Sequence, residues 1–265
     1  MRTTLFASLL MLSAASTNAE TVRLHAAGSL RAALTEIVRD FESSNSGQHQ
    51  VEAIFGASGL LREKIEAGEP AHVFASADTG HPKKLADQGR AVGPVVIFAR
   101  NQLCALVRAG LEVKSETLLD VMLNPKTRVG ISTPKADPSG DYAFALFAKA
   151  DAMKPGARAA LEAKALQLAG GLTSPKAPEG KTLYGWLMAT DQADLFLTYC
   201  TNAIQAKAEV PALSVVSIPK SINVGADYGL VVLNGAPTAA SGLADHVRSS
   251  RGQAILSRHG FGAGD

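Results

Sequence analysis

Three short segments of this sequence place a hydroxyl side chain where a helix is expected to begin, directly after an apolar strand. They are His25-Ala26-Ala27-Gly28-Ser29-Leu30, Phe55-Gly56-Ala57-Ser58-Gly59-Leu60 and Ala136-Asp137-Pro138-Ser139-Gly140-Asp141. A helix start offers unpaired backbone N–H groups and the positive end of the helix dipole, which attract an anion without any formal positive charge. Each serine hydroxyl adds a donor. One such serine is usually a helix cap, but three of them together predict an anion site.

The elements that must position these turns alternate between short apolar runs and amphipathic helical stretches, which is typical of an α/β fold with mainly parallel sheets. We expect strands at 21–26, 50–55, 73–76, 128–132 and 195–199, and helices at 30–43, 60–67, 141–150 and 157–167. The pattern passes twice through strand, helix and strand. We therefore predict two doubly wound lobes with a ligand cleft between them, because open parallel sheets bind ligands beyond the carboxyl ends of their strands.

The polar segment Arg100-Asn101-Gln102 separates two extended runs, 95–98 and 103–107, and we place the first passage between the lobes there. The predicted first lobe comprises 20–99 and 219–265, and the second comprises 100–218.

The N-terminus has the pattern of a secretory signal peptide. A positive charge at Arg2 precedes the short apolar run Leu5–Leu12 and a small-x-small cleavage pattern that ends at Ala19. The apolar run is too short to span a bilayer. We expect cleavage after Ala19, so that residues 1–19 are removed and the mature protein is periplasmic.

The composition excludes several classes of protein. Hydrophobic residues make up 46% of the chain, as in a globular protein. Without Arg2, 25 of the 26 basic residues remain against 24 acidic ones. This near-neutral, interspersed charge lacks the electrostatic footprint of a nucleic-acid binder and the basic stripe of a membrane-surface protein. The six histidines show no metal-ligand spacing, and we expect a monomer without a cofactor.

Six short motifs follow one another along essentially the whole mature chain. They are Ala26-Ala27-Gly28-Ser29-Leu30, Phe55-Gly56-Ala57-Ser58, Phe74-Ala75-Ser76-Ala77-Asp78, Ser139-Gly140-Asp141-Tyr142-Ala143, Leu197-Thr198-Tyr199 and Arg258-His259-Gly260-Phe261. In this order and spacing they resemble the periplasmic molybdate-binding proteins of ABC importers. The resemblance implies a periplasmic binding protein fold of type II. It also implies a tetrahedral oxyanion ligand, molybdate first and tungstate second, and a membrane permease as partner.

The resemblance also implies a set of ligand-binding residues by motif position. Ser29 and Ser58 would supply hydroxyl and backbone donors, Ser139 a backbone N–H, and Tyr199 its phenolic hydroxyl. A further backbone donor falls near Lys181, where the family more often has an apolar residue. A cage of neutral donors disfavours hydrogen phosphate, because the proton of that ion would meet only donors. Such a cage performs no chemistry, so we expect no enzyme activity.

The two cysteines, Cys104 and Cys200, are an even number in an exported protein and permit one disulfide. Two buried free thiols are the alternative. In the lobe topology that the resemblance implies, their strands are antiparallel neighbours, so a disulfide is geometrically possible if the Cα atoms lie within about 7 Å. Both alternatives stay open at this point.

Three other functions are alternatives to molybdate binding. A hydrolase with Ser58 or Ser29 as nucleophile would need a histidine base and a G-x-S-x-G elbow, and the segment 55–59 lacks that spacing. The effector lobe of a transcription regulator shares the architecture, but the export signal and the lack of a helix-turn-helix segment argue against it. A binding protein for a different small anion also stays open, because Gly28, Ser139 and Lys181 depart from the family pattern.

Overall fold

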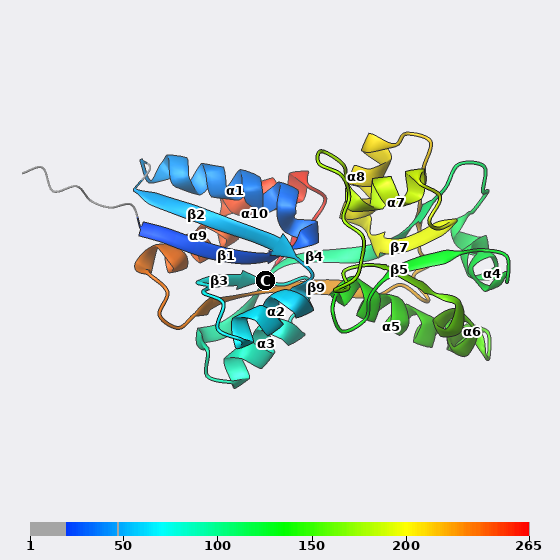
Figure 1. Cartoon of the computed structure of the whole chain (residues 1–265), viewed down its shortest axis with the longest axis horizontal. Coiled ribbons are helices and arrows are strands. Elements are labelled where there is room, and N and C mark those ends of the chain that lie inside the picture. The colour runs from blue at the N-terminus through cyan, green and yellow to red at the C-terminus, as the bar shows by residue number, and fades with distance from the viewer. Residues whose placement is uncertain (1–19, 47, 265) are drawn as a thin grey trace, which may run out of the picture.

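The chain forms two lobes that lie side by side along the long axis of the molecule (Figure 1). The computed structural model describes residues 20–46 and 48–264, so the predicted signal peptide lies outside the described residues. Each lobe has a twisted sheet with helices packed on both faces (Figure 1). The mixed α/β fold with two doubly wound lobes, predicted from the alternation of strands and helices, is confirmed. Within the described ranges, no helix is long and apolar enough to cross a membrane.

The first lobe is built on a sheet with the strand order β2-β1-β3-β9-β4. Its strands are β1 (Glu20–Ala27), β2 (His49–Gly56), β3 (Val73–Ala75), β9 (Gly225–Leu233), the first part of β4 (Ala91–Val107) and the short β10 (Gly262–Ala263). Its helices are η1 (Gly28–Leu30), α1 (Arg31–Ser44), α2 (Ser58–Glu66), α3 (Gly80–Asp87), α9 (Thr238–Arg248) and α10 (Ser250–Arg258). Strand β1 runs parallel to β2 and β3, so the carboxyl ends of all three point the same way.

The second lobe continues from β4 through the order β7-β5-β6, with β8 also paired to β4. Its strands are β5 (Val129–Ser132), β6 (Leu166–Ala169), β7 (Leu195–Tyr199) and β8 (Ser214–Ser217). Its helices are η2 (Ser115–Thr117), α4 (Leu118–Leu123), α5 (Pro138–Met153), α6 (Ala157–Lys164), α7 (Leu183–Ala189) and α8 (Cys200–Glu209). Strand β5 is parallel to β6 and β7, while β4 crosses antiparallel to β7.

Strand β4 connects the two lobes without a break. Its polar segment, predicted to interrupt the strand, still pairs with β9, since Arg100 faces Asp227 and Gln102 faces Gly225. From Leu103 onward the partners are β7 and, from Cys104, also β8. Ladder pairing satisfies the backbone whatever the side chains are, which is why polar residues continue the strand. We therefore propose that the first crossing between lobes falls between Gln102 and Leu103 rather than before Arg100.

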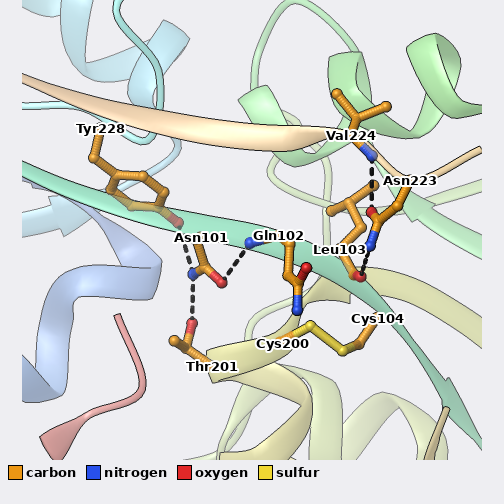
Figure 2. The surroundings of a disulfide bond; sticks show 9 residues. All are labelled: Asn101, Gln102, Leu103, Cys104, Cys200, Thr201, Asn223, Val224 and Tyr228. Atoms are coloured by element: carbon orange, nitrogen blue, oxygen red, sulfur yellow. Dashed lines mark hydrogen bonds between the residues drawn. A yellow bond between two sulfur atoms is a disulfide. The ribbon is translucent and has the colours of Figure 1, made fainter. Parts of the chain in front are cut away.

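A disulfide joins Cys104 to Cys200 just beyond this crossing (Figure 2). Cys104 lies on β4 opposite Thr198 of the antiparallel β7, and Cys200 is the first residue of α8. The Cα atoms are 4.8 Å apart, within the range that the bond requires. The structure thereby decides between the two alternatives that the sequence left open. The bond fixes the start of α8 to the strand that enters the second lobe.

Several elements differ from the sequence-based expectation. The predicted helix 157–167 ends at Lys164, and Leu166–Ala169 instead forms the strand β6 beside β5. Helix α8 and strand β10 were not predicted. Helix α8 buries only small or polar side chains, such as Ala203 and Ala206, so it has no strong apolar periodicity to detect.

Candidate functional site

The carboxyl ends of the strands in the two lobes face a common cleft, a cavity of about 960 Å³. Ser29 follows β1, Ser58 follows β2 and Tyr199 ends β7, and all three line this cavity. The loop 175–182 of the second lobe lines the same cavity, as does the first turn of α1. The structure therefore brings four of the five predicted site residues to one cavity. Ser29, Ser58 and Tyr199 come from strand ends of both lobes, and Lys181 comes from the loop 175–182.

Ser58 and Ser29 present hydroxyl groups from the first lobe. The Ser58 side chain is buried, and its Oγ accepts the N–H of Ala77 at 3.1 Å. Its own hydrogen therefore remains for an acceptor in the cleft. The Oγ of Ser29 lies 3.0 Å from the Tyr228 hydroxyl, which accepts a hydrogen bond from Asn101 Nδ2 at 3.3 Å. This arrangement lets Tyr228 donate to Ser29, which frees the Ser29 hydrogen for a ligand.

Tyr199 presents its hydroxyl from the second lobe. The residue is 2% exposed, and its Oη donates to the carbonyl oxygen of Ala77 at 3.2 Å, across the cleft. Its ring packs between the rings of Tyr142 and Tyr228, with centroids 6.2 and 5.4 Å away. Burial raises the pKa of Tyr199 well above its ordinary value, so the hydroxyl keeps its one proton, which in this structure is donated to the Ala77 carbonyl.

Two helices begin at the cleft without a side-chain cap. Helix α2 has Ala57 at its N-cap and helix α8 has Tyr199, and neither residue bonds to the first backbone N–H groups. Uncapped N–H groups at the positive end of a helix favour an anion. The cleft therefore offers backbone donors besides the serine hydroxyls, except for the N–H of Gly59, which donates to the Ala136 carbonyl.

The backbone N–H groups of Ser139 and Lys181, which the resemblance implied as ligand donors, both bond within the second lobe. Helix α5 begins at Pro138 with Asp137 as its N-cap, so the N–H of Ser139 donates to Asp137 Oδ1 at 3.0 Å. Ser139 is buried behind the cleft, and its Oγ has no hydrogen-bond partner among the described residues. The N–H of Lys181 donates to the Pro178 carbonyl at 3.1 Å. Its ammonium group lies at the rim, 3.7 Å from Glu209.

Asp137 is the cleft residue that the sequence analysis did not single out. It lines the cavity, half-buried, beside the helix start where a serine had been expected to act. Desolvation, together with the negative charges of Asp141 and Asp78, raises the pKa of Asp137 to about 6. Aspartate before a proline at the first helical position is a known helix-start signature, and it was the signal available in the sequence.

The walls of the cleft can hold an anion but lack the groups for covalent catalysis. Arg31, Lys176 and Lys181 line the outer part, and the Arg31 guanidinium stacks 4.7 Å above the Phe55 ring. No histidine is among the described residues that line the cavity, so neither serine has a histidine base beside it. Within ranges 20–46 and 48–264, no group of three or more histidine, cysteine or acidic side chains could hold a metal ion.

Residues 22–262 match the family model described as bacterial extracellular solute-binding protein. An uncharacterized protein of Pasteurella multocida is 36% identical over 79% of this chain and 86% of its own length. The molybdate-binding protein ModA of Mycobacterium tuberculosis is 27% identical over 92% of this chain and 85% of its own length.

Two solved structures share the fold. The periplasmic molybdate-binding protein of Azotobacter vinelandii superimposes with a TM-score of 0.73 at 21% identity, over 91% of this chain and 98% of that one. The sulfate-binding protein SubI of Mycobacterium tuberculosis gives a TM-score of 0.74 at 17% identity, over 92% of this chain and 87% of that one.

Proposed function

This chain belongs to the family of bacterial extracellular solute-binding proteins, and from that premise we propose that it captures a tetrahedral oxyanion in the cleft between its lobes. The family binds solutes and does not transform them. Molybdate is the ligand we favour, with tungstate second, because the motifs of the chain and its relative from Mycobacterium tuberculosis both point to that anion.

One observation carries this proposal: uncharged hydroxyl groups from both lobes meet in one cleft, where the Tyr199 hydrogen would turn from the Ala77 carbonyl to the anion. Ser29 and Ser58 come from the first lobe, and Tyr199 comes from the second. A dianion that leaves water must replace many hydrogen bonds, and hydrogen bonds to a charged acceptor are the strong ones. Donors held by strand ends and helix starts are already oriented, so little ordering is needed when the anion binds.

We further propose that the protein hands the anion to the membrane permease of an ABC importer and acts as a monomer outside the cytoplasm. The lobes would close on the anion by a hinge motion, with β4 and β9 as the connecting strands. A cleft that binds and releases its ligand by this motion needs no resident cofactor.

Titration calorimetry with molybdate, tungstate, sulfate and phosphate tests the proposal. We expect heat and a rise in melting temperature with the two group-6 oxyanions. If none of the four anions produces either signal, the proposed function is wrong.

The variant Ser58→Ala tests whether the first lobe supplies a ligand donor. Removing one hydrogen bond to a charged group costs about 1.5–3 kcal/mol, so oxyanion affinity should fall by about 10-fold or more. Ser43→Ala is the matched control, because the Ser43 hydroxyl donates to the Arg39 carbonyl on an exposed part of α1, away from the cleft. An unchanged affinity in Ser58→Ala would remove Ser58 from the site.

A further inference from the structure

A carboxylate lies among the donors of the proposed anion cleft. Asp137 lines the cavity together with Ser29, Ser58 and Tyr199. It caps α5, and its Oδ1 accepts the N–H of Ser139 at 3.0 Å. That backbone N–H is therefore occupied by the carboxylate and not left for an anion. An acceptor at this position is unexpected in a cage that binds a bare dianion.

The fold keeps this carboxylate in place. Gly170 follows β6 with φ of +73°, and a Cβ at that position would lie 2.4 Å from the Asp137 Cβ and 2.5 Å from Oδ2. Only a residue without a side chain leaves room for the carboxyl group there. With Oδ1 held by Ser139 and the other side held against Gly170, the carboxylate has little freedom to turn out of the cleft.

The second oxygen of this carboxylate is available to a ligand. Among the described residues, none donates a hydrogen bond to Asp137 Oδ2. A bare dianion beside an ionised carboxylate would be repelled, and the repulsion is strong where water is excluded. One proton between the two oxygens replaces that repulsion with a charge-assisted hydrogen bond.

We propose that Asp137 makes the cleft select an oxyanion together with one proton, carried either by the ligand or by Asp137 itself. This inference rests on the proposed function, since it concerns the same site. An oxyanion with its own hydrogen, such as hydrogen phosphate, would donate that hydrogen to Oδ2. A bare dianion, such as molybdate, would bind only as a proton from water reaches Oδ2, which then donates to the anion.

The surroundings favour uptake of this proton. The charged groups acting on Asp137 are both negative, Asp141 on α5 and Asp78 after β3. Tyr184, Tyr199 and Tyr228 face it from α7, β7 and β9 as neutral hydroxyls, because burial raises the pKa of each of them. The cations that line the cavity are Arg31, Lys176 and Lys181. With a pKa of about 6, the Asp137 carboxyl of the ligand-free protein is mostly ionised at neutral pH. A bound dianion would raise that pKa further.

The variant Asp137→Asn separates the two ways of supplying the proton. Asparagine is also a good N-cap, so its Oδ1 can keep the bond from Ser139 while Nδ2 becomes a permanent donor. The experiment is titration calorimetry with molybdate and with phosphate at about pH 8, in two buffers that differ in ionisation enthalpy. The difference in binding heat between the buffers gives the number of protons taken up. Asp151→Asn, on the same helix, is the control that should keep the proton uptake of the unmodified protein, because Asp151 is not one of the charges acting on Asp137.

We expect the unmodified protein to take up close to one proton per molybdate at that pH, and Asp137→Asn to take up none. Because pH 8 lies about two units above the pKa, molybdate affinity should rise up to about 100-fold in the variant. Hydrogen phosphate should instead bind more weakly to the variant, since its proton would meet the Nδ2 donor.

Three outcomes would overturn the inference. Molybdate binding without proton uptake by the unmodified protein would overturn it and leave the proposed function standing. An unchanged ratio of molybdate affinity to phosphate affinity between the unmodified protein and Asp137→Asn would also overturn the inference and leave the proposed function standing. Failure of every oxyanion to bind either protein, with an unchanged melting temperature showing that the variant is folded, would reject the proposed function and this inference together.

Discussion

Ser58 illustrates how one hydroxyl group serves the fold and the proposed ligand at once. It accepts a backbone N–H from Ala77 in the neighbouring turn, which fixes the direction of the Cβ–Oγ bond. The single hydroxyl hydrogen is then the part left for an anion. Tyr199 shares this design, since packing against two other tyrosine rings fixes the phenol before any ligand arrives. Donors oriented in this way discriminate between anions by size and by proton content rather than by charge alone.

Tyr199→Phe should weaken oxyanion binding by about 10-fold or more while leaving the fold intact. The variant loses only Oη, which donates to Ala77 across the cleft, and it keeps the ring that packs in the core. The free energy of unfolding should therefore fall by only about 1 kcal/mol. Calorimetry and thermal unfolding measure the two effects separately.

Tyr142→Phe serves as the control for this experiment. The Tyr142 ring packs edge-on against Tyr199, but Tyr142 does not line the cavity. We expect Tyr142→Phe to keep its oxyanion affinity, and equal losses in the two variants would show that the effect does not come from a hydroxyl that lines the cleft.

The strands of the second lobe are held together at the end that lies away from the cleft by one carboxylate. Asp194, just before β7, accepts the backbone N–H of Arg128 at 2.8 Å and the Arg108 guanidinium at 2.7 Å. Arg108 follows β4 and Arg128 precedes β5, so three strands meet at this side chain. The strands that carry the site at one end are therefore tied together at their other end.

This cluster predicts a pH dependence of stability. Hydrogen bonds from Arg128, together with the Arg108 bond, hold the pKa of Asp194 well below its usual range. A lowered pKa contributes stability that is present above the unfolded value of about 3.9 and is lost as the pH falls toward the folded value. Because the arginine side chains are 41% exposed, we expect a contribution of only about 1–2 kcal/mol.

Asp194→Asn should therefore lower the free energy of unfolding at neutral pH by that amount. The difference in the free energy of unfolding between the two proteins should shrink as the pH is lowered from about 5 to about 3. In that range unfolding of the unmodified protein is coupled to protonation of Asp194. Urea unfolding at a series of pH values measures this difference. A gap that stays constant or widens on acidification would contradict the assignment.

The two lobes touch across the cleft at backbone level. The N–H of Gly59, in the first turn of α2, donates to the Ala136 carbonyl of the second lobe at 2.8 Å. A Cβ at Gly59 would lie 2.3 Å from the carbonyl oxygen of Lys135 and 2.7 Å from that of Ala136. The approach of the lobes therefore depends on the missing side chain.

Gly59→Ala should hold the lobes apart without unfolding either one. We expect a larger radius of gyration in small-angle X-ray scattering and a weaker oxyanion affinity, since donors from the two lobes can no longer reach one anion. Gly242→Ala is the control, because a Cβ there makes only ordinary contacts with Phe41. An unchanged radius and affinity in Gly59→Ala would show that this contact does not set the separation of the lobes.

Much of the molecule could be predicted from local sequence. The alternation of strands and amphipathic helices indicated the two-lobed fold, and small residues with a serine at the strand ends located Ser29 and Ser58. These features depend on neighbours within a few residues, where hydrophobic periodicity and helix-start preferences act. Tyr199 was located by resemblance, and the structure brings it to the same cavity as the two serines.

Only the tertiary structure decided the features that depend on distant contacts. It placed Asp137, and not Ser139, among the residues that line the cleft. It also showed that the carboxylate takes the helix N–H and fits against the distant Gly170. It also brought Cys104 and Cys200 together from positions 96 residues apart. Local pattern determines where a helix can start, but the space and the partners left to each side chain depend on which strands become neighbours. The position of the Asp137 carboxylate therefore depends on the pairing of β5 with β6, which brings Gly170 beside it.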